Sequence, residues 1–276
     1  MDALLAHYLT LWALTQPQPL AETRTSRLYT VIYQGETVVL KLLTEYGWEE
    51  RAGAVALRHF DGHGAVRLYQ SDEQAQLLEY VPGGDLLPMV ESGSDGDAQA
   101  SRIIADILNQ IHSNPSINAS AGLFPLERWF EALFAQAAKD EQSIYRHGAQ
   151  VARRLLDDPR DVRVLHGDIH HMNIRQSARG WLAFDPKGLL GERTYDCANS
   201  LCNPFRGRDR FDPLVHDEAR LLRNAAILAN ETGIDRARVL AFTFAYSCLS
   251  AAWTVSDGET EWALNIARIV EPHVTL

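Results

Sequence analysis

The sequence has few of the residues that would build a disulfide framework, a zinc site or a membrane span. Its three cysteines, Cys197, Cys202 and Cys248, are odd in number and lack metal-ligand spacing. No apolar run approaches the roughly 20 residues that a membrane helix needs. The first residues also lack the basic region of a signal peptide. We therefore expect a soluble, cytoplasmic protein with no membrane contact.

Positive charge is also scarce. Lys and Arg number 26 against 36 Asp and Glu, which gives a formal net charge of -10. Such a field repels nucleic acid and favours cationic ligands. We therefore expect a small-molecule partner, cationic rather than anionic, and no nucleic acid. The sequence gives no indication of an oligomeric state.

Residues 1–81 predict an N-terminal lobe. A short helical segment ends at Pro17, because proline cannot continue a helix. Branched and aromatic residues then predict strands at 28–33 and 37–43, a helix at 49–60, and strands at 65–69 and 76–80. The pattern is that of an antiparallel sheet with one main helix.

Residues 82–276 predict a second, mostly helical lobe. Turn residues at 81–85 form the hinge, and the polar segment 91–97 is expected to be a loop. Helical periodicity covers 98–112, 129–156 and the chain beyond 213, with short strands at 162–165 and 181–184. The expected fold class is α+β, with two unequal lobes around one cleft.

Two short motifs carry the chemistry. Asp168 and Asn173 follow the strand at 162–165, and Asp185 follows the strand at 181–184. Phosphoryl transfer needs a carboxylate that orients the attacking hydroxyl and oxygen ligands that hold Mg²⁺ on ATP. The spacing is that of a kinase catalytic loop and its second metal-binding aspartate, so Asp168 is the candidate base. An accidental pair of turn and strand-end aspartates would require every spacing to be coincidental.

Further nucleotide contacts are predicted from the N-terminal lobe. Lys41 lies on a strand where a kinase places its phosphate-binding lysine, and Glu50 is the expected partner, with Glu49 as a competitor. Glu79 and Val81 fall at the adenine-binding hinge. No glycine-rich loop precedes Lys41; Ser26 and its neighbours stand in its place and are expected to contact phosphate.

The chain also departs from protein kinases. Gly167 replaces the arginine that precedes the catalytic aspartate, and the sequence has no activation segment that ends in Ala-Pro-Glu. Both features favour a small-molecule acceptor over a protein. A zinc site built from His166, His170 and His171 is disfavoured, because neighbouring residues on a tight loop converge poorly on one ion.

Residues 166–173, the run 185–199 that begins Asp-Pro-Lys-Gly, and the Asn-Pro pair at 203–204 resemble the aminoglycoside phosphotransferase family. The resemblance is to the branch of streptomycin 6-phosphotransferases and hydroxyurea-resistance kinases, and it extends to 49–66 and 77–86. It implies a bilobal protein-kinase-like fold, ATP and Mg²⁺ as cofactors, and a role in antibiotic resistance. It also implies that Asp168 is the base, Asn173 and Asp185 the metal ligands, Lys41 the phosphate clamp and Asp196 a supporting residue.

The resemblance implies a streptomycin-like acceptor, and the acidic composition favours it over neutral hydroxyurea. An endogenous metabolite as acceptor, or a catalytically silent nucleotide-binding scaffold, is also compatible with the sequence. Trp253 and Trp262 could line the acceptor pocket, although packing between helices is the commoner role of such tryptophans. The candidate acceptor carboxylates are Glu91, Asp95, Asp97, Asp209, Asp212, Glu259 and Glu261.

Overall fold

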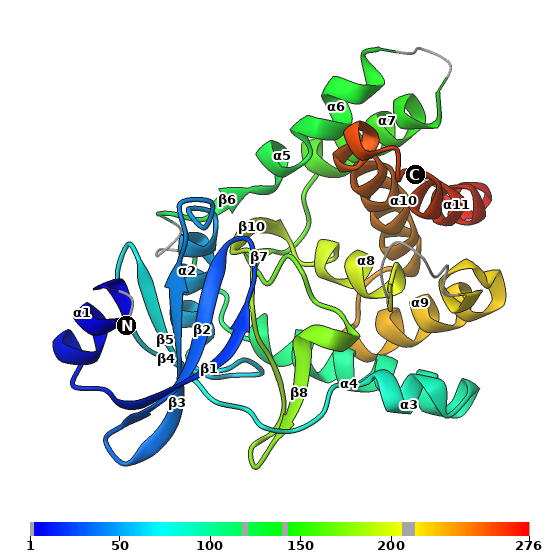
Figure 1. The fold of residues 1–276 in the computed structure, drawn as a ribbon. Helices are drawn as coiled ribbons and strands as arrows, with labels where there is room; N and C mark the ends of the chain where they lie inside the picture. The colour runs from blue at the N-terminus through cyan, green and yellow to red at the C-terminus, as the bar shows by residue number, and fades with distance from the viewer. Residues whose placement is uncertain (1–2, 118–120, 140–142, 206–212, 276) are drawn as a thin grey trace.

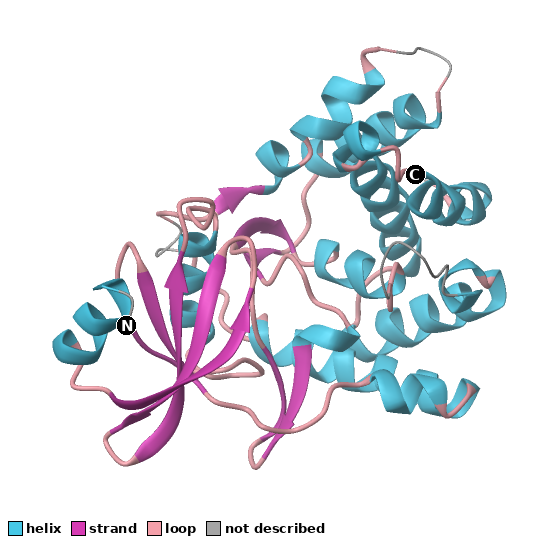
Figure 2. Cartoon of the chain, in the orientation of Figure 1, coloured by secondary structure: helices cyan, strands magenta, loops and turns pink. Residues whose placement is uncertain are grey.

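The computed structural model describes residues 3–117, 121–139, 143–205 and 213–275. A twisted sheet forms the N-terminal lobe, and a larger group of helices forms the rest of the molecule (Figure 1, Figure 2). This is the predicted two-lobed α+β architecture. Among the described residues, no helix is both long and apolar enough to cross a membrane.

The N-terminal sheet has five antiparallel strands in the order β1-β2-β3-β5-β4. Their bounds are β1 Thr15–Glu22, β2 Ser26–Tyr33, β3 Glu36–Leu43, β4 Leu68–Ser71 and β5 Ala75–Glu79. Strand β1 was not predicted, because Pro17 and Pro19 indicated only the end of a helix. It lies at the sheet edge, where proline is tolerated because only one side of the strand needs hydrogen bonds.

Strand β3 separates two environments by the alternation of its side chains. Leu40 and Leu42 join a small core with Tyr8 of helix α1 (Ala3–Leu11). Lys41 points to the opposite face, where it meets helix α2 (Glu50–Phe60). The sheet alternation therefore delivers a lysine to the side that faces the cleft.

Most of the C-terminal lobe is helical, and its long helix α10 packs against α6, α7, α8, α9 and α11 (Figure 1). The helices are α3 Leu87–Glu91, α4 Ser94–Ile111, α5 Leu126–Trp129, α6 Glu131–Ala137, α7 Ile144–Asp157, α8 Tyr195–Leu201, α9 Glu218–Thr232, α10 Arg236–Trp253 and α11 Glu261–Val270. One prediction was wrong here. The expected loop 91–97 contains the start of α4, whose first-turn acids favour a helix N-terminus. In the described residues, the helical periodicity predicted over 129–156 corresponds mainly to α6 and α7.

Short strands hold the two motif-bearing loops together. Strand β10 (Leu189–Glu192) pairs with β7 (Val162–Leu165) and with β6 (Phe124–Pro125). Strands β8 (Ile174–Ser177) and β9 (Gly180–Ala183) form a hairpin. The loop after β7 and the loop after β9 therefore meet under the N-terminal sheet.

Candidate active site

On the side of the N-terminal lobe, the site contains a charge network in which Lys41 and Glu50 are buried and the Asp185 side chain is 34% exposed. Lys41 Nζ lies 2.7 Å from Glu50 Oε2 and 2.5 Å from Asp185 Oδ1. Burial alone would lower the pKa of Lys41, but the charges of Asp185 and Glu50 outweigh it and raise that pKa above its usual value. For Asp185, burial alone would raise the pKa, but Lys41 and Lys187 lower it to about 2. Lys41 and Asp185 are therefore charged at neutral pH.

Two glycines allow helix α2 to approach the loop that carries Asp185. A Cβ atom on Gly53 would lie 2.3 Å from the carbonyl oxygen of Pro186, and one on Gly188 would lie 2.1 Å from that of Ala52. Side chains at either position would push the two segments apart. The close approach keeps Glu50, at the start of α2, within reach of Lys41.

Asp168 lies on the side of the site that faces the helical lobe. Its carboxylate accepts a hydrogen bond from Asn199 Nδ2 to Oδ1 at 3.0 Å and a longer one from Asn173 Nδ2 to Oδ2 at 3.4 Å. Lys187 Nζ is 3.8 Å from Oδ2. The structure thus brings the predicted residues Asp168 and Asn173 together, and it adds Asn199, to which the sequence motifs assigned no role.

Asp196 of helix α8 fixes the loop that carries Asp168. Its carboxylate accepts hydrogen bonds from the backbone N–H groups of His166 at 3.0 Å and Gly167 at 2.7 Å, and lies 2.9 Å from His112 Nε2. The ring of His166 accepts from the Asp168 N–H and contacts the Phe184 carbonyl oxygen. His166 is therefore a structural residue, and the described part of the chain holds no cluster of three or more His, Cys, Asp or Glu arranged for a metal.

The donor set fits Mg²⁺. Asn173 uses its amide nitrogen on the backbone oxygen of Asp168 at 3.0 Å, so its amide oxygen is left for a cation. Asp185 engages Lys41 through Oδ1 and retains Oδ2, and within the described residues neither spare oxygen has another partner. Oxygen-only donors suit a hard cation that takes its remaining ligands from phosphate and water.

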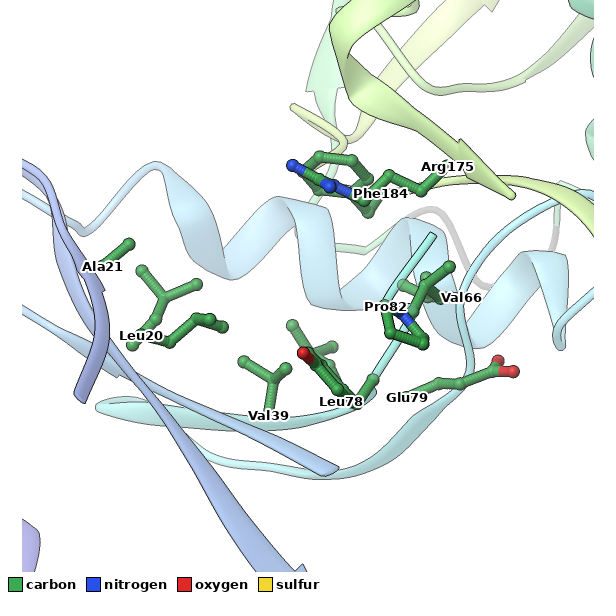
Figure 3. Close-up of a pocket in the computed structure, with 12 residues that line it drawn as sticks. Leu20, Ala21, Val39, Val66, Leu78, Glu79, Pro82, Arg175 and Phe184 are labelled. Carbon is green, nitrogen blue, oxygen red and sulfur yellow. The ribbon is translucent and has the colours of Figure 1, made fainter. Parts of the chain in front are cut away.

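A pocket of about 330 Å³ lies under the N-terminal sheet, between the lobes. Figure 3 shows Val39 and Leu78 on one side and Phe184 on the other, with Leu20 and Ala21 of the unpredicted strand β1 at one end. Its walls are mostly apolar, as a flat base requires. The full lining is Leu20, Ala21, Leu28, Val39, Val66, Leu78, Glu79, Tyr80, Val81, Pro82, Arg175 and Phe184.

The predicted hinge residues Glu79 and Val81 both line this pocket. The Glu79 side chain points away from it (Figure 3) and pairs with Arg179 at 2.5 Å. Its backbone, rather than its carboxylate, therefore faces a ligand. The direction of the Glu79 side chain depends on its tertiary partner Arg179 and could not be predicted from the sequence motif.

Ser26 does not reach the charge network. Its side chain is buried at the start of β2, where its hydroxyl lies 3.2 Å from that of Thr23. The neighbouring Thr25 instead donates to Glu50 Oε1 at 3.0 Å. Thr25 is one of the neighbours of Ser26 that the prediction included, but its contact with Glu50 of α2 could not be predicted from the local sequence.

The two predicted acceptor tryptophans, Trp253 and Trp262, have different surroundings. Trp253 is 41% exposed and lines an open groove of about 200 Å³ with Trp48 and Trp129. Trp262 is not among the described residues that line this groove; it stacks on Phe205 with ring centroids 4.4 Å apart. Of the two tryptophans, only Trp253 therefore lines a groove that could receive an acceptor in the described structure.

Among the candidate carboxylates, Asp97 is unavailable to a ligand. It is buried and accepts hydrogen bonds from Arg220, Arg223 and Asn224 at 2.5 to 3.0 Å. Glu261 pairs with Arg268 at 3.1 Å. Asp209 and Asp212 lie outside the described residues. The prediction that Asp97 contributes to acceptor binding was wrong, because sequence periodicity did not reveal its arginine partners.

Sequence and fold comparisons agree with this geometry. Streptomycin 3''-kinase of Klebsiella pneumoniae is 42% identical over 76% of this chain and 77% of its own length. Hydroxyurea phosphotransferase of Kitasatospora aureofaciens is 31% identical over 92% of this chain and 73% of its own length. Streptomycin 6-kinase of Streptomyces glaucescens is 30% identical over 99% and 90%.

Among solved structures, aminoglycoside phosphotransferase APH(4)-Ia in complex with ADP and hygromycin B superposes with a TM-score of 0.61. The two proteins share 13% sequence identity, over 99% of this chain and 98% of that one, so the match establishes the fold. Residues 11–258 match the family described as aminoglycoside/hydroxyurea antibiotic resistance kinase. With this match and the relatives above, the chain belongs to that family.

Proposed function

We propose that the chain is an ATP-dependent kinase that transfers the γ-phosphoryl group to a hydroxyl of a streptomycin-like aminoglycoside. The observation that carries the proposal is the meeting of Lys41, Asp185, Asn173 and Asp168 next to a mostly apolar pocket, whose lining includes Phe184, the residue before Asp185. The pocket accommodates the adenine ring, and Lys41 holds the α- and β-phosphates. Asn173 and Asp185 are the metal ligands.

Asp168 acts on the acceptor hydroxyl. Its carboxylate orients that hydroxyl and takes its proton as the oxygen attacks the γ-phosphorus and the bond to the β-phosphate oxygen breaks. Lys187, 3.8 Å from Asp168 and raised in pKa by Asp168 and Asp185 against the opposite effect of burial, places a positive charge beside the transferred group. Bound Mg²⁺ neutralises charge that develops on the β- and γ-phosphates.

Relatives named for streptomycin and the net charge of -10 favour a cationic acceptor. The hydroxyurea phosphotransferase relative supports neutral hydroxyurea as the second candidate. A silent scaffold is disfavoured because the full set of catalytic side chains is present. Oligomeric state and cellular location do not enter the proposal.

The test is ATP consumption by the purified protein with streptomycin, other aminoglycosides, hydroxyurea and simple polyols at several salt concentrations. We expect turnover of streptomycin with a KM that rises with salt, because salt screens exposed charge pairs. Nuclear magnetic resonance of the product identifies the phosphorylated hydroxyl. Good activity on a neutral acceptor, with none on any guanidinylated aminoglycoside, would contradict the choice of acceptor. Absence of activity on every acceptor would favour the scaffold.

A further inference from the structure

Asn199 connects the carboxylate of Asp168 to the interior of the helical lobe. It lies in α8 with 2% of its surface exposed. Its Nδ2 is 3.0 Å from Asp168 Oδ1 and 2.8 Å from the hydroxyl oxygen of Tyr246, and its Oδ1 is 3.0 Å from Asn203 Nδ2. Both amide hydrogens and the amide oxygen therefore have partners.

The orientation of this amide follows from a backbone group. The Phe205 N–H can only donate, and it lies 3.1 Å from Asn203 Oδ1, so that atom must be oxygen. Asn203 consequently presents Nδ2 to Asn199, where it also donates to the backbone oxygen at 2.8 Å. Asn199 must then present Oδ1 to Asn203 and Nδ2 to Asp168. The reverse orientation would set two donors, or two acceptors, against each other.

Each oxygen of Asp168 thereby accepts a hydrogen bond from a neutral amide, and Lys187 lies farther away, 3.8 Å from Oδ2. Asn199 binds Oδ1, and Asn173 makes the longer contact with Oδ2. A carboxylate that rotates freely would present its lone pairs to the acceptor hydroxyl in the productive direction only part of the time, and small misplacements at a reacting centre are costly. Neutral amides fix the direction while leaving the carboxylate able to accept a proton.

We propose that Asn199 is a positioning residue, which orients the Asp168 carboxylate toward the acceptor hydroxyl and is itself oriented by Asn203 and Tyr246. The role rests on the kinase function proposed above. It predicts that turnover depends on Asn199 only through Asp168. It also predicts that Asn203, which does not touch Asp168 in this network, influences turnover through the orientation of the Asn199 amide.

The decisive experiment is a double-mutant cycle of Asn199→Leu and Asp168→Asn. In the wild-type background, Asn199→Leu should lower kcat about 10- to 100-fold with little change in the KM for ATP. In the Asp168→Asn background, the same substitution should change the residual kcat by less than about twofold, because the group it orients is gone. A purely structural role would lower kcat by the same factor in both backgrounds, and that result would overturn the proposal.

Two gentler variants test the network if Asn199→Leu folds poorly. Asn203→Asp replaces the donor that faces Asn199 Oδ1 with an acceptor, which turns the Asn199 amide and should lower kcat nearly as much as Asn199→Leu. Tyr246→Phe removes one acceptor of Asn199 and should lower kcat about fivefold, the value of one neutral hydrogen bond. Unchanged kcat in both variants would also overturn the proposal.

Ser200→Ala is the matched control. Ser200 neighbours Asn199 in α8, is 4% exposed, and its hydroxyl donates to the Cys197 carbonyl oxygen at 2.9 Å. This substitution should leave kcat unchanged, and equal thermal midpoints would show that the remaining variants retain the fold.

If wild-type protein phosphorylates none of the acceptors, the cycle is measured on basal ATP hydrolysis, where Asp168 orients water. Failure of the acceptor assignment and failure of the Asn199 role are thereby distinguished.

Discussion

The two sides of the active site hold their aspartates by different means. Asp185 faces the N-terminal lobe and is bound by the charge of Lys41, which also pairs with Glu50. Asp168 faces the helical lobe and is held by the neutral amides of Asn199 and Asn173, with Lys187 no nearer than 3.8 Å. Both carboxylates are fixed in place, but the ion pair of Asp185 with Lys41 is at 2.5 Å, whereas that of Asp168 with Lys187 is at 3.8 Å.

The difference matches the chemistry proposed for each side. A metal ligand must stay ionised, and an adjacent ammonium group lowers the pKa of Asp185 to about 2 against the opposing effect of burial. A base must accept a proton, and a direct salt bridge would make its carboxylate a poorer acceptor. Hydrogen bonds from neutral amides also favour the ionised carboxylate, but less strongly than a positive charge in direct contact. The following predictions test this contrast, from the largest expected effect to the smallest.

Removing the negative charge of Asp168, the aspartate held by neutral amides, should have the largest effect on kcat. Asp168→Asn preserves shape but cannot take the acceptor proton, so kcat should fall about 10²- to 10⁴-fold while ATP affinity is retained. Steady-state kinetics and calorimetric titration of ATP measure the two quantities. A kcat near that of wild type would mean that another group serves as the base.

Asp97 extends the comparison to a carboxylate held by charge away from the phosphate site. Asp97→Asn leaves Arg220 and Arg223 without their buried partner and should destabilise the fold by about 3–5 kcal/mol. The acceptor KM of the folded protein should not change. Urea unfolding measures the first quantity, and the exposed Asp95→Asn on the same helical turn is the control. An increased acceptor KM without loss of stability would restore Asp97 as a binding residue.

The same cluster predicts a pH dependence. Burial tends to raise the pKa of Asp97, but hydrogen bonds from Arg220 and its charge hold that pKa below its usual value. A lowered folded-state pKa means that the contribution is present above the unfolded Asp pKa and is lost as pH falls through the folded value. The stability difference between wild type and Asp97→Asn should therefore shrink in acid. A difference that grows with acidity would contradict this linkage.

Lys41→Ala removes a charge-assisted contact to phosphate, so it should raise the KM for ATP and lower kcat. Together these changes should lower kcat/KM by about 10- to 100-fold. Lys139→Ala, on the helical lobe, is the control.

Asp185→Ala should also weaken the Mg²⁺ dependence of ATP binding, measured by titrating the metal. Unchanged metal dependence would place the cation elsewhere.

The smallest effect concerns how closely the two sides approach. Gly53→Ala places a methyl group against the Pro186 carbonyl oxygen and should cost about 1–3 kcal/mol of stability through overpacking. Gly84→Ala is the control, because its added methyl group would meet no atom within 4 Å. Thermal unfolding reads both variants. Equal midpoints would show that α2 shifts freely relative to the Asp185 loop.

Much of this site could be predicted because its parts are local in sequence. Asp168 and Asn173 share one loop, Asp185 follows a short strand, and β3 alternation sets the direction of Lys41. Each position follows from a short pattern whose chemistry is specific. The two-lobed α+β organisation followed from the order of strands and helices, and the resemblance carried by these motifs implied the kinase-like fold.

The missing parts depend on contacts between distant segments. Asn199 lies 31 positions from Asp168, and its role depends on how α8 packs beneath the catalytic loop. Strand β1 required knowledge of the sheet edge, since its prolines are compatible with a strand only there. The partners of Asp97 lie more than 120 positions away in α9. No local periodicity reports such pairings.

The ion pair between Lys41 and Asp185 also makes nucleotide and metal binding interdependent. In this structure each group neutralises the other at 2.5 Å. When a phosphate takes over Lys41, Asp185 is released for a cation, and a cation on Asp185 likewise releases Lys41 for phosphate. Each ligand removes a competitor of the other, so the two should bind with positive cooperativity, and by thermodynamic reciprocity each should raise the affinity of the other by the same factor.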